Sequence, residues 1–167
     1  SFLEYARRAE PSLVSTGLHG LVEEVVDLEA ALARDLSVEI VVELEPVFCR
    51  ADPEQLRRAI LNLLQNAIQA GAGSDKAVTL KSWRAKDTSY FSVSNFGSCI
   101  SEDAREHLFE PFYTTKEKGT GLGLAFVHEI ISDHGGTITV TSNDVDGTCF
   151  TISLESAGDQ EPEVEKQ

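Results

Sequence analysis

Residues 51 to 71 read ADPEQLRRAILNLLQNAIQAG, and this stretch decides which fold the chain can form. Asp52 offers an N-cap acceptor, Pro53 occupies a position where no N–H is needed, and Gln55 stands at the capping-box position. Apolar residues then recur at helical spacing until Gly71 and Gly73, so we predict an amphipathic helix from 52 to about 70. Its core-facing stripe would consist of Leu56, Ala59, Ile60, Leu63, Leu64, Ala67 and Ile68.

Two asparagines, Asn62 and Asn66, lie off this stripe and one turn apart. Asparagine competes for backbone hydrogen bonds and is a middling helix former, so two of them in mid-helix need a reason. One interpretation is that they are ordinary solvated polar positions. The other is that their amide oxygens act as neutral ligands for the Mg²⁺ of a bound nucleotide, because magnesium prefers hard oxygen ligands. The spacing is compatible with both.

Upstream of this helix the pattern predicts another helix and a strand. Residues 38 to 44 are rich in β-branched side chains and end before Pro46, as a strand would, and Phe48 follows in a short extended piece. Before them, apolar steps of three and four residues indicate a helix from 18 to about 33. Its apolar stripe would be Leu18, Leu21, Val22, Val25, Leu28 and Leu32.

Downstream, alternating patterns predict strands at 77–83, 89–95, 137–142 and 147–154. Helical patterns lie at about 102–108 and 122–134, with a loop at 110–120 between them. Gly135 and Gly136 can cap the second of these helices, and Asp146-Gly147 joins the last two strands in a hairpin.

Irregular interleaving of helices and strands, with an antiparallel hairpin at the end, disfavours a doubly wound parallel sheet. We therefore expect an α+β fold, in which a mixed, mostly antiparallel sheet carries helices on one face. Along the strand 89–95, Phe91, Val93 and Asn95 alternate, so Asn95 points to the buried face. A buried amide requires a specific partner.

The segment GTGLGL, residues 119 to 124, is a glycine-rich turn that opens a predicted helix. Backbone N–H groups and the positive helix end at such a turn can hold phosphate oxygens. A purely structural turn is an equally good interpretation of a glycine loop on its own. Lys116 and Lys118 precede the turn, where their ammonium groups either reach a β- or γ-phosphate or are ordinary solvated lysines.

Composition limits the classes of partner. A net charge of −14 disfavours binding to nucleic acid or to an anionic membrane, since both require clustered Lys and Arg. The apolar runs stay below the roughly 18 residues that cross a bilayer, so we expect a soluble, cytoplasmic domain. Cys49, Cys99 and Cys149 are odd in number and widely spaced, as free thiols in a reducing compartment would be. A start at Ser1 without Met predicts a piece of a longer protein.

Four segments occur in the order of a known family: NLLQNA (62–67), SNFGSCI (94–100), FEPFYTTK (109–116) and GTGLGL (119–124). They resemble the N, first glycine, F and second glycine boxes of the ATP-binding catalytic domains of bacterial two-component sensor histidine kinases. The resemblance extends through HGGTITVTSNDVDGTCFTISL (134–154) and covers residues 11 to 154. Four ordered boxes are a specific signal.

The resemblance implies a two-layer α/β sandwich with a flexible ATP lid at about Tyr113 to Gly119, a fold shared with DNA gyrase and a heat-shock chaperone. It implies that Asn66 ligates Mg²⁺, that Asn62 supports the phosphates of ATP, and that Lys116 joins them in catalysis. Phe109 and Phe112 would pack at the near end of the lid. The remaining nucleotide contacts would be Asn95, Gly97, Ile100, Phe112, Lys118, Gly119, Thr120, Gly121, Leu122, Gly123 and Leu124.

The first glycine box departs from the family at two positions. Asn95 stands where the family usually has an Asp that accepts a hydrogen bond from the adenine amino group, and Cys99 stands where a second glycine is common. An Asn carbonyl can still accept from the adenine N6–H and its NH₂ can donate to N1, but the bond loses its ionic component.

The resemblance also implies how the chain is divided and what it works with. Residues 1–10 would end a helix of the dimerisation domain, 11–154 would form the catalytic domain, and 155–167 would be a disordered acidic tail. None of His19, His107, His128 and His134 has the sequence context of the family's phosphoacceptor, so we place that histidine outside the chain. The expected partners are ATP or ADP, the protein's own dimerisation and histidine-phosphotransfer domain, and a response regulator. The full-length protein would be a homodimer, with or without a membrane anchor.

Two alternatives belong to other functional classes. The departures at Asn95 and Cys99 are compatible with a nucleotide-binding regulatory module that lacks kinase activity. A serine kinase of the anti-sigma type uses the same fold without a dimerisation helix, but FLEYARR at residues 2–8 resembles the end of such a helix and argues against it.

Overall fold

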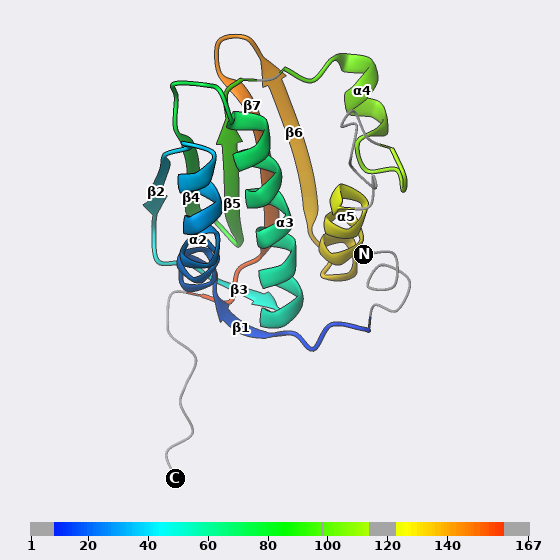
Figure 1. Ribbon diagram of the computed structural model, residues 1–167. Helices are drawn as coiled ribbons and strands as arrows, with labels where there is room; N and C mark the ends of the chain where they lie inside the picture. Colours follow the sequence, from blue (N-terminus) through cyan, green and yellow to red (C-terminus); the bar gives the residue numbers. More distant parts are fainter. Residues whose placement is uncertain (1–8, 98, 114–122, 159–167) are drawn as a thin grey trace.

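The computed structural model describes residues 9–97, 99–113 and 123–158 (Figure 1). Three longer helices lie side by side on one face of a sheet, and the other face carries no helix among these residues. The helices are α2 (Leu18–Asp35), α3 (Pro53–Gly71), the short α4 (Glu102–His107) and α5 (Gly123–Asp133). This is the predicted two-layer α+β arrangement.

The main sheet has five strands in the order β2-β4-β5-β7-β6. Strands β2 and β4 are parallel, and the other neighbouring pairs are antiparallel, so the prediction of a mixed, mostly antiparallel sheet is confirmed. The strands are β2 (Ile40–Leu44), β4 (Val78–Ala85), β5 (Thr88–Asn95), β6 (Thr137–Asn143) and β7 (Gly147–Glu155).

A second, two-stranded sheet is absent from the sequence prediction. Its strands are β1 (Val14–Gly17) and β3 (Phe48–Ala51), which pair antiparallel. Each is four residues long, and strands this short carry too little alternation to be recognised. The pairing brings the N-terminal part of the chain beside the start of α3, which follows β3 directly.

The core lies between the helices and the sheet. All seven residues of the predicted α3 stripe are at most 2% exposed, and Phe91, Val93 and Asn95 of β5 are equally buried on the helix-facing side of the sheet. On α2 the prediction is wrong for Leu28, whose side chain is 64% exposed although its spacing matches the stripe. The apolar stripe therefore predicted the buried face of α3 correctly and failed on α2 at Leu28.

Local signals set the helix ends as predicted. The Asp52 side chain accepts hydrogen bonds from the backbone N–H groups of Glu54 and Gln55, and Pro53 is the first residue of α3. After α5, Gly135 takes a φ of 71°, in the left-handed region that favours glycine. A Cβ on Gly136 would lie 2.3 Å from a β7 carbonyl oxygen, so this close approach of the backbones also requires glycine.

The described chain continues past residue 154, into the range that was predicted to be the tail. Glu155 ends β7, Ser156 forms a bridge with Cys49, and the Ala157 N–H donates to the Phe48 carbonyl over 3.0 Å. The predicted helix end at 2–8, most of the lid and the tail from 159 onward lie outside the described residues. No helix in the described part of the chain is both long and apolar enough to span a bilayer.

Candidate nucleotide site

Helix α3 presents Asn62 and Asn66 beside its buried stripe, and both side chains are partly exposed. Asn62 Nδ2 donates to the Arg58 carbonyl, one turn earlier, over 2.9 Å. That bond fixes the amide so that Oδ1 is the free end of the group, and Oδ1 lies 3.6 Å from the point where a Cβ on Gly123 would sit. The Asn62 oxygen therefore faces the start of α5.

The start of α5 lies opposite Asn62 and forms the other side of this candidate site. Gly123 is exposed, whereas Leu124 packs against the core and anchors the first turn. In the described part of the chain α5 begins at Gly123, and the N-terminal end of a helix is its positive end, which favours an anion. Predicted phosphate contacts at Lys116, Lys118, Gly119, Thr120, Gly121 and Leu122 lie outside the described residues.

Asn95 lies at the end of β5, beside the C-terminal end of α3. Its side chain is 2% exposed, and its Cβ is 3.7 Å from the point where a Cβ on Gly71 would sit. Nδ2 donates to the Phe96 carbonyl at 3.4 Å, which is long for a hydrogen bond and restrains the amide weakly. Thr148, which is 3% exposed, lies directly opposite Asn95 on β7. A buried amide with so weak a bond retains hydrogen-bonding capacity for a ligand.

The loop after Asn95 is held in place from two sides. Gly97 has a φ of 113°, and a Cβ there would lie 2.9 Å from the Ala70 carbonyl oxygen, so this position requires glycine. Farther along, the Ile100 N–H donates to Ser142 Oγ over 2.8 Å, and Ser142 Oγ lies 2.7 Å from Thr148 Oγ1. The loop is thereby fastened to the end of α3 and to the β6–β7 hairpin.

The cysteines fit the prediction of free thiols. Cys49 is buried, Cys149 is half-buried, and Cys99 is exposed in the loop, 3.5 Å from Ser142 Oγ. Burial raises the pKa of the Cys49 thiol to about 12, so it stays protonated and inert at neutral pH.

The two phenylalanines predicted to pack near the lid differ. Phe109 packs against the core, stacks on His128 at a centroid distance of 5.3 Å and meets Phe150 edge-on at 6.3 Å. Phe112 is 64% exposed and has a φ of 68°, and the lid residues 114–122 that it was predicted to pack near lie outside the described residues. His128, expected on the helix surface, is partly covered by its stack on Phe109.

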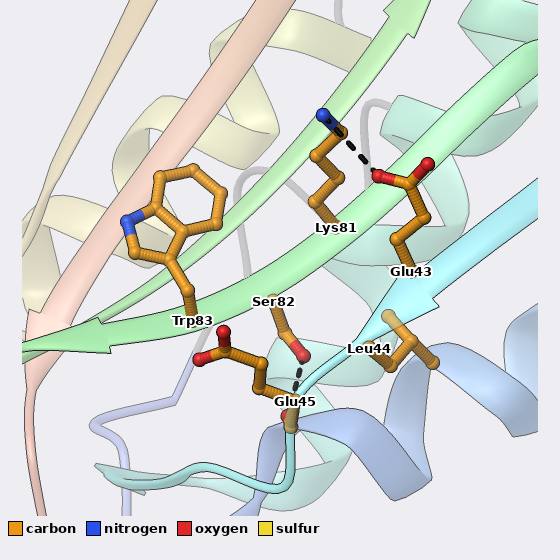
Figure 2. Close-up of a pocket in the computed structure, with 6 residues that line it drawn as sticks. All are labelled: Glu43, Leu44, Glu45, Lys81, Ser82 and Trp83. Carbon is orange, nitrogen blue, oxygen red and sulfur yellow. Dashed lines mark hydrogen bonds and ion pairs between the residues drawn. The ribbon is translucent and has the colours of Figure 1, made fainter.

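A separate pocket of about 480 Å³ lies at the β2 edge of the sheet. Figure 2 shows Lys81 paired with Glu43 over 3.3 Å and Ser82 donating to the Glu45 carbonyl. Trp83 forms part of its lining and pairs with Tyr90 in the β4–β5 register, whereas Asn95 lies five residues farther along β5, or about 17 Å. This pocket is therefore distinct from the site that the asparagines mark.

Comparison with known proteins identifies the kind of site. The family described as "Histidine kinase-, DNA gyrase B-, and HSP90-like ATPase" matches residues 51–158, a range that contains α3, the Asn95 loop, α5 and the final hairpin. The chain belongs to this ATPase family. An ATPase domain binds ATP, and the residues between α3, α5 and the Asn95 loop are the candidate site for it.

Individual relatives place the ATPase domain among the histidine kinases. It is 32% identical to the catalytic domain of the histidine kinase ThkA, with a TM-score of 0.78, and the match covers 86% of this chain and 95% of that one. It is 29% identical to full-length ShkA, solved in complex with AMPPNP, with a TM-score of 0.83 over 93% of this chain and 34% of ShkA. The sensor histidine kinase ZraS of Escherichia coli (strain K12) is 34% identical over 154 residues, which are 91% of this chain and 33% of ZraS.

These relatives confirm the predicted family and fold, and the chain spans only a third of the length of ZraS. Within the ATPase domain, the structure brings Asn62, Gly123 and Leu124 to the middle of α3, and Asn95 and Gly97 to its end, while Ile100 is bonded to Ser142 on β6. About nine residues of α3 separate the two groups, a rise of about 13 Å.

Several residues around this candidate site were missed by sequence reasoning. Ser142 and Thr148 hold the Asn95 loop from the hairpin, and Lys76 lies over the Phe96 ring at 4.4 Å. His134 was read as a residue without functional context, yet it is 7% exposed and bonded to the start of α3. Serine, threonine and lysine in a strand or turn carry no pattern of their own, so nothing in the sequence marked these contacts.

Proposed function

We propose that this ATPase domain binds Mg·ATP and transfers the γ-phosphate to a histidine on a dimerisation domain, for relay to a response regulator. The observation that carries the proposal is the separation of two polar groups along α3. At the middle of the helix Asn62 Oδ1 faces the N-terminus of α5, and at its C-terminal end the buried Asn95 amide lies beside the Gly97 loop. An anion-binding helix end and a buried, hydrogen-bonding amide suit the phosphates and the base of one nucleotide.

The residue roles follow from that orientation. Asn66 would supply an oxygen ligand to Mg²⁺, one turn from Asn62, which would contact the phosphates. Asn95 would accept from the adenine amino group, with Gly97 and Ile100 shaping the base end of the site. Lys116 would neutralise charge on the transferred group, and Lys118, Phe112 and residues 119–124 would complete the contacts around the phosphates. Bound Mg²⁺ would screen charge between the phosphate oxygens.

The nucleophile would come from outside the chain. His134 uses both ring nitrogens within the fold, and His19 Nδ1 lies 3.2 Å from both the N and the O of Val47. His128 is stacked on Phe109 and lies on α5, after the glycine-rich turn, and His107 pairs with Glu110 on the surface. In-line transfer requires an acceptor within about 3.5 Å of the γ-phosphorus, and none of these positions is built for it.

In the proposed whole protein, residues 1–10 connect the dimerisation domain to a catalytic domain of residues 11–154. The intact protein would be a homodimer with this domain in the cytoplasm. Support comes from the relatives, which are sensor kinases about three times as long as the matched region, and from ShkA, which was solved with AMPPNP.

The experiment supplies the upstream dimerisation domain as a separate polypeptide and follows label from γ-labelled ATP. We expect ATP binding by this chain, no label on the chain alone, and label on the added domain that is acid-labile and alkali-stable, as phosphohistidine is. Binding without transfer would favour the regulatory module, and an acid-stable product would favour the serine kinase. Label on His19, His107, His128 or His134 would overturn the assignment of the acceptor to another domain.

A further inference from the structure

Asp52 connects three parts of the chain that are distant in sequence. Its Oδ1 accepts from the N–H groups of Glu54 and Gln55 in the first turn of α3, and its Oδ2 accepts from the Ser12 N–H over 3.0 Å. Its own N–H donates to His134 Nε2, also over 3.0 Å. One residue therefore joins the N-terminal segment, the start of α3 and the end of α5.

The neighbours of His134 fix its tautomer, in which Nδ1 carries the proton and Nε2 is the acceptor. Nδ1 lies 2.7 Å from the Ile130 carbonyl oxygen, to which it can only donate, and Nε2 accepts from Asp52. The ring is 7% exposed, so water competes little for these bonds. The end of α5 is thus held to the start of α3 by a partly buried hydrogen bond with a defined direction.

The same two helices meet again at the proposed phosphate end. Residues 52 to 62 of α3 rise about 15 Å, and the eleven residues of α5 rise about 16 Å. The helices therefore run antiparallel in register, with His134 at Asp52 and Gly123 opposite Asn62. Any shift of α5 along α3 at the Asp52 end moves the first turn of α5 relative to Asn62, because a helix of this length slides as a rigid rod.

The N-terminal segment is fastened to the same turn of α3. The Ser12 N–H bonds to Asp52, and Gln55 Nε2 donates to the Ala9 carbonyl over 2.8 Å. In Figure 1 this blue segment passes the starting end of α3 before it enters β1 (Val14–Gly17). Chain entering the ATPase domain from residue 9 onward therefore contacts Asp52 before it contacts the sheet.

We propose that Asp52 is a positioning residue that couples the N-terminal segment to the placement of α5 against Asn62, and so to the phosphate end of the ATP site. The inference rests on the proposed function, because it takes the Asn62–Gly123 corner to hold phosphates. Displacement of residues 9–12 removes one N–H donor, that of Ser12, from the Asp52 carboxylate and loosens the Asp52 N–H that holds His134. Any movement of the preceding domain would reach the nucleotide by this route.

The test is a double-mutant cycle on this chain, with calorimetric titration of Mg·ATP and of adenosine. Ser12→Pro removes the N–H that Asp52 accepts, and Ser12→Ala keeps it and serves as the matched control. His134→Leu removes the acceptor at the other end, and His134→Gln restores an acceptor and guards against loss of folding in the leucine variant. Ser12 is exposed and takes no part in the proposed ATP contacts.

We expect Ser12→Pro to lower the affinity for Mg·ATP about threefold, as the loss of one hydrogen bond would, and Ser12→Ala to leave this affinity unchanged. Adenosine affinity should not change, because only the phosphate end moves, whereas general loss of structure would weaken both ligands. In the His134→Leu background Ser12→Pro should add nothing, and in the His134→Gln background its effect should return. Additive effects of the two substitutions, or equal losses for adenosine and Mg·ATP, would overturn the inference. Wild-type chain that binds neither ligand would instead refute the proposed function.

Discussion

Asn95→Asp should change nucleotide affinity and stability in opposite directions. If Asn95 accepts from the adenine amino group, a carboxylate at the same place converts a neutral hydrogen bond into a charge-assisted one. The difference is roughly 1 kcal/mol, so we expect ATP to bind about five- to tenfold more tightly. The side chain is 2% exposed, so solvent screens this gain little.

Without nucleotide the same change is unfavourable. Asn95 Nδ2 donates to the Phe96 carbonyl at 3.4 Å, and the substitution replaces that donor with a second acceptor in a buried position. Burying an unpaired acceptor costs about 1–3 kcal/mol, which for a chain of 167 residues lowers the melting temperature by about 2–12 °C. Burial raises the pKa of the new carboxyl, so this cost is present at neutral pH and shrinks as the pH falls through that raised value.

Calorimetric titration and thermal melts with and without Mg·ATP measure the two effects separately. The variant should melt lower than wild type without ligand and gain about 1 kcal/mol more from saturating ATP, because its affinity is higher. Ser94→Asp is the matched control, since it adds the same charge one residue away on the opposite face of β5. Unchanged or weaker ATP binding by Asn95→Asp would refute the contact between Asn95 and the adenine amino group.

Three further predictions address metal binding, helix capping and the glycine loop. Asn66→Ala should weaken Mg·ATP far more than metal-free ATP in parallel titrations, because the helix cannot replace the lost oxygen ligand, and equal losses would count against a metal role. Asp52→Ala should cost about 1–2 kcal/mol in denaturant unfolding near pH 7. Partial burial raises the pKa of the Asp52 carboxyl, but the N–H groups that donate to it outweigh burial and hold that pKa below its ordinary value. The stabilisation by the Asp52 cap is therefore present above about pH 4 and is lost as the pH falls through the lowered pKa. Gly97→Ala should lower stability by about 1–3 kcal/mol, since φ is 113° and the Ala70 oxygen is too close, and an unchanged melting curve would contradict the strain.

Much of the fold could be predicted because its signals are local. Asp52, Pro53 and the apolar stripe set the start and the buried face of α3, and both are as expected. Gly135 and Gly136 likewise marked the end of α5. In each case the signal and the structure it specifies lie within one or two turns of each other, so periodicity and capping chemistry suffice.

The candidate site was only partly predictable. The order of four motifs in the sequence named Asn62, Asn95 and Gly97 as site residues; Asn62 lies on α3, and Asn95 and Gly97 lie beside its C-terminal end. Phe112 matched the same motif but is exposed, and Leu28 matched the stripe of α2 but is exposed as well. Spacing predicts which side chains share a face, and it does not say whether another element covers that face.

By itself, the sequence determined the helices, the strands of the main sheet and the family of ATPases, because capping residues, periodicity and ordered motifs act over short distances along the chain. Tertiary structure alone decided the pairing of β1 with β3, the bond from Asp52 to His134 and the meeting of Asn62 with Gly123. The partners in the last two contacts are 82 and 61 residues apart. Their proximity results from the packing of α3 and α5 on one face of the sheet. The hydrophobic effect that drives this packing depends on buried apolar area and has no direction, so it does not specify which polar groups come into contact.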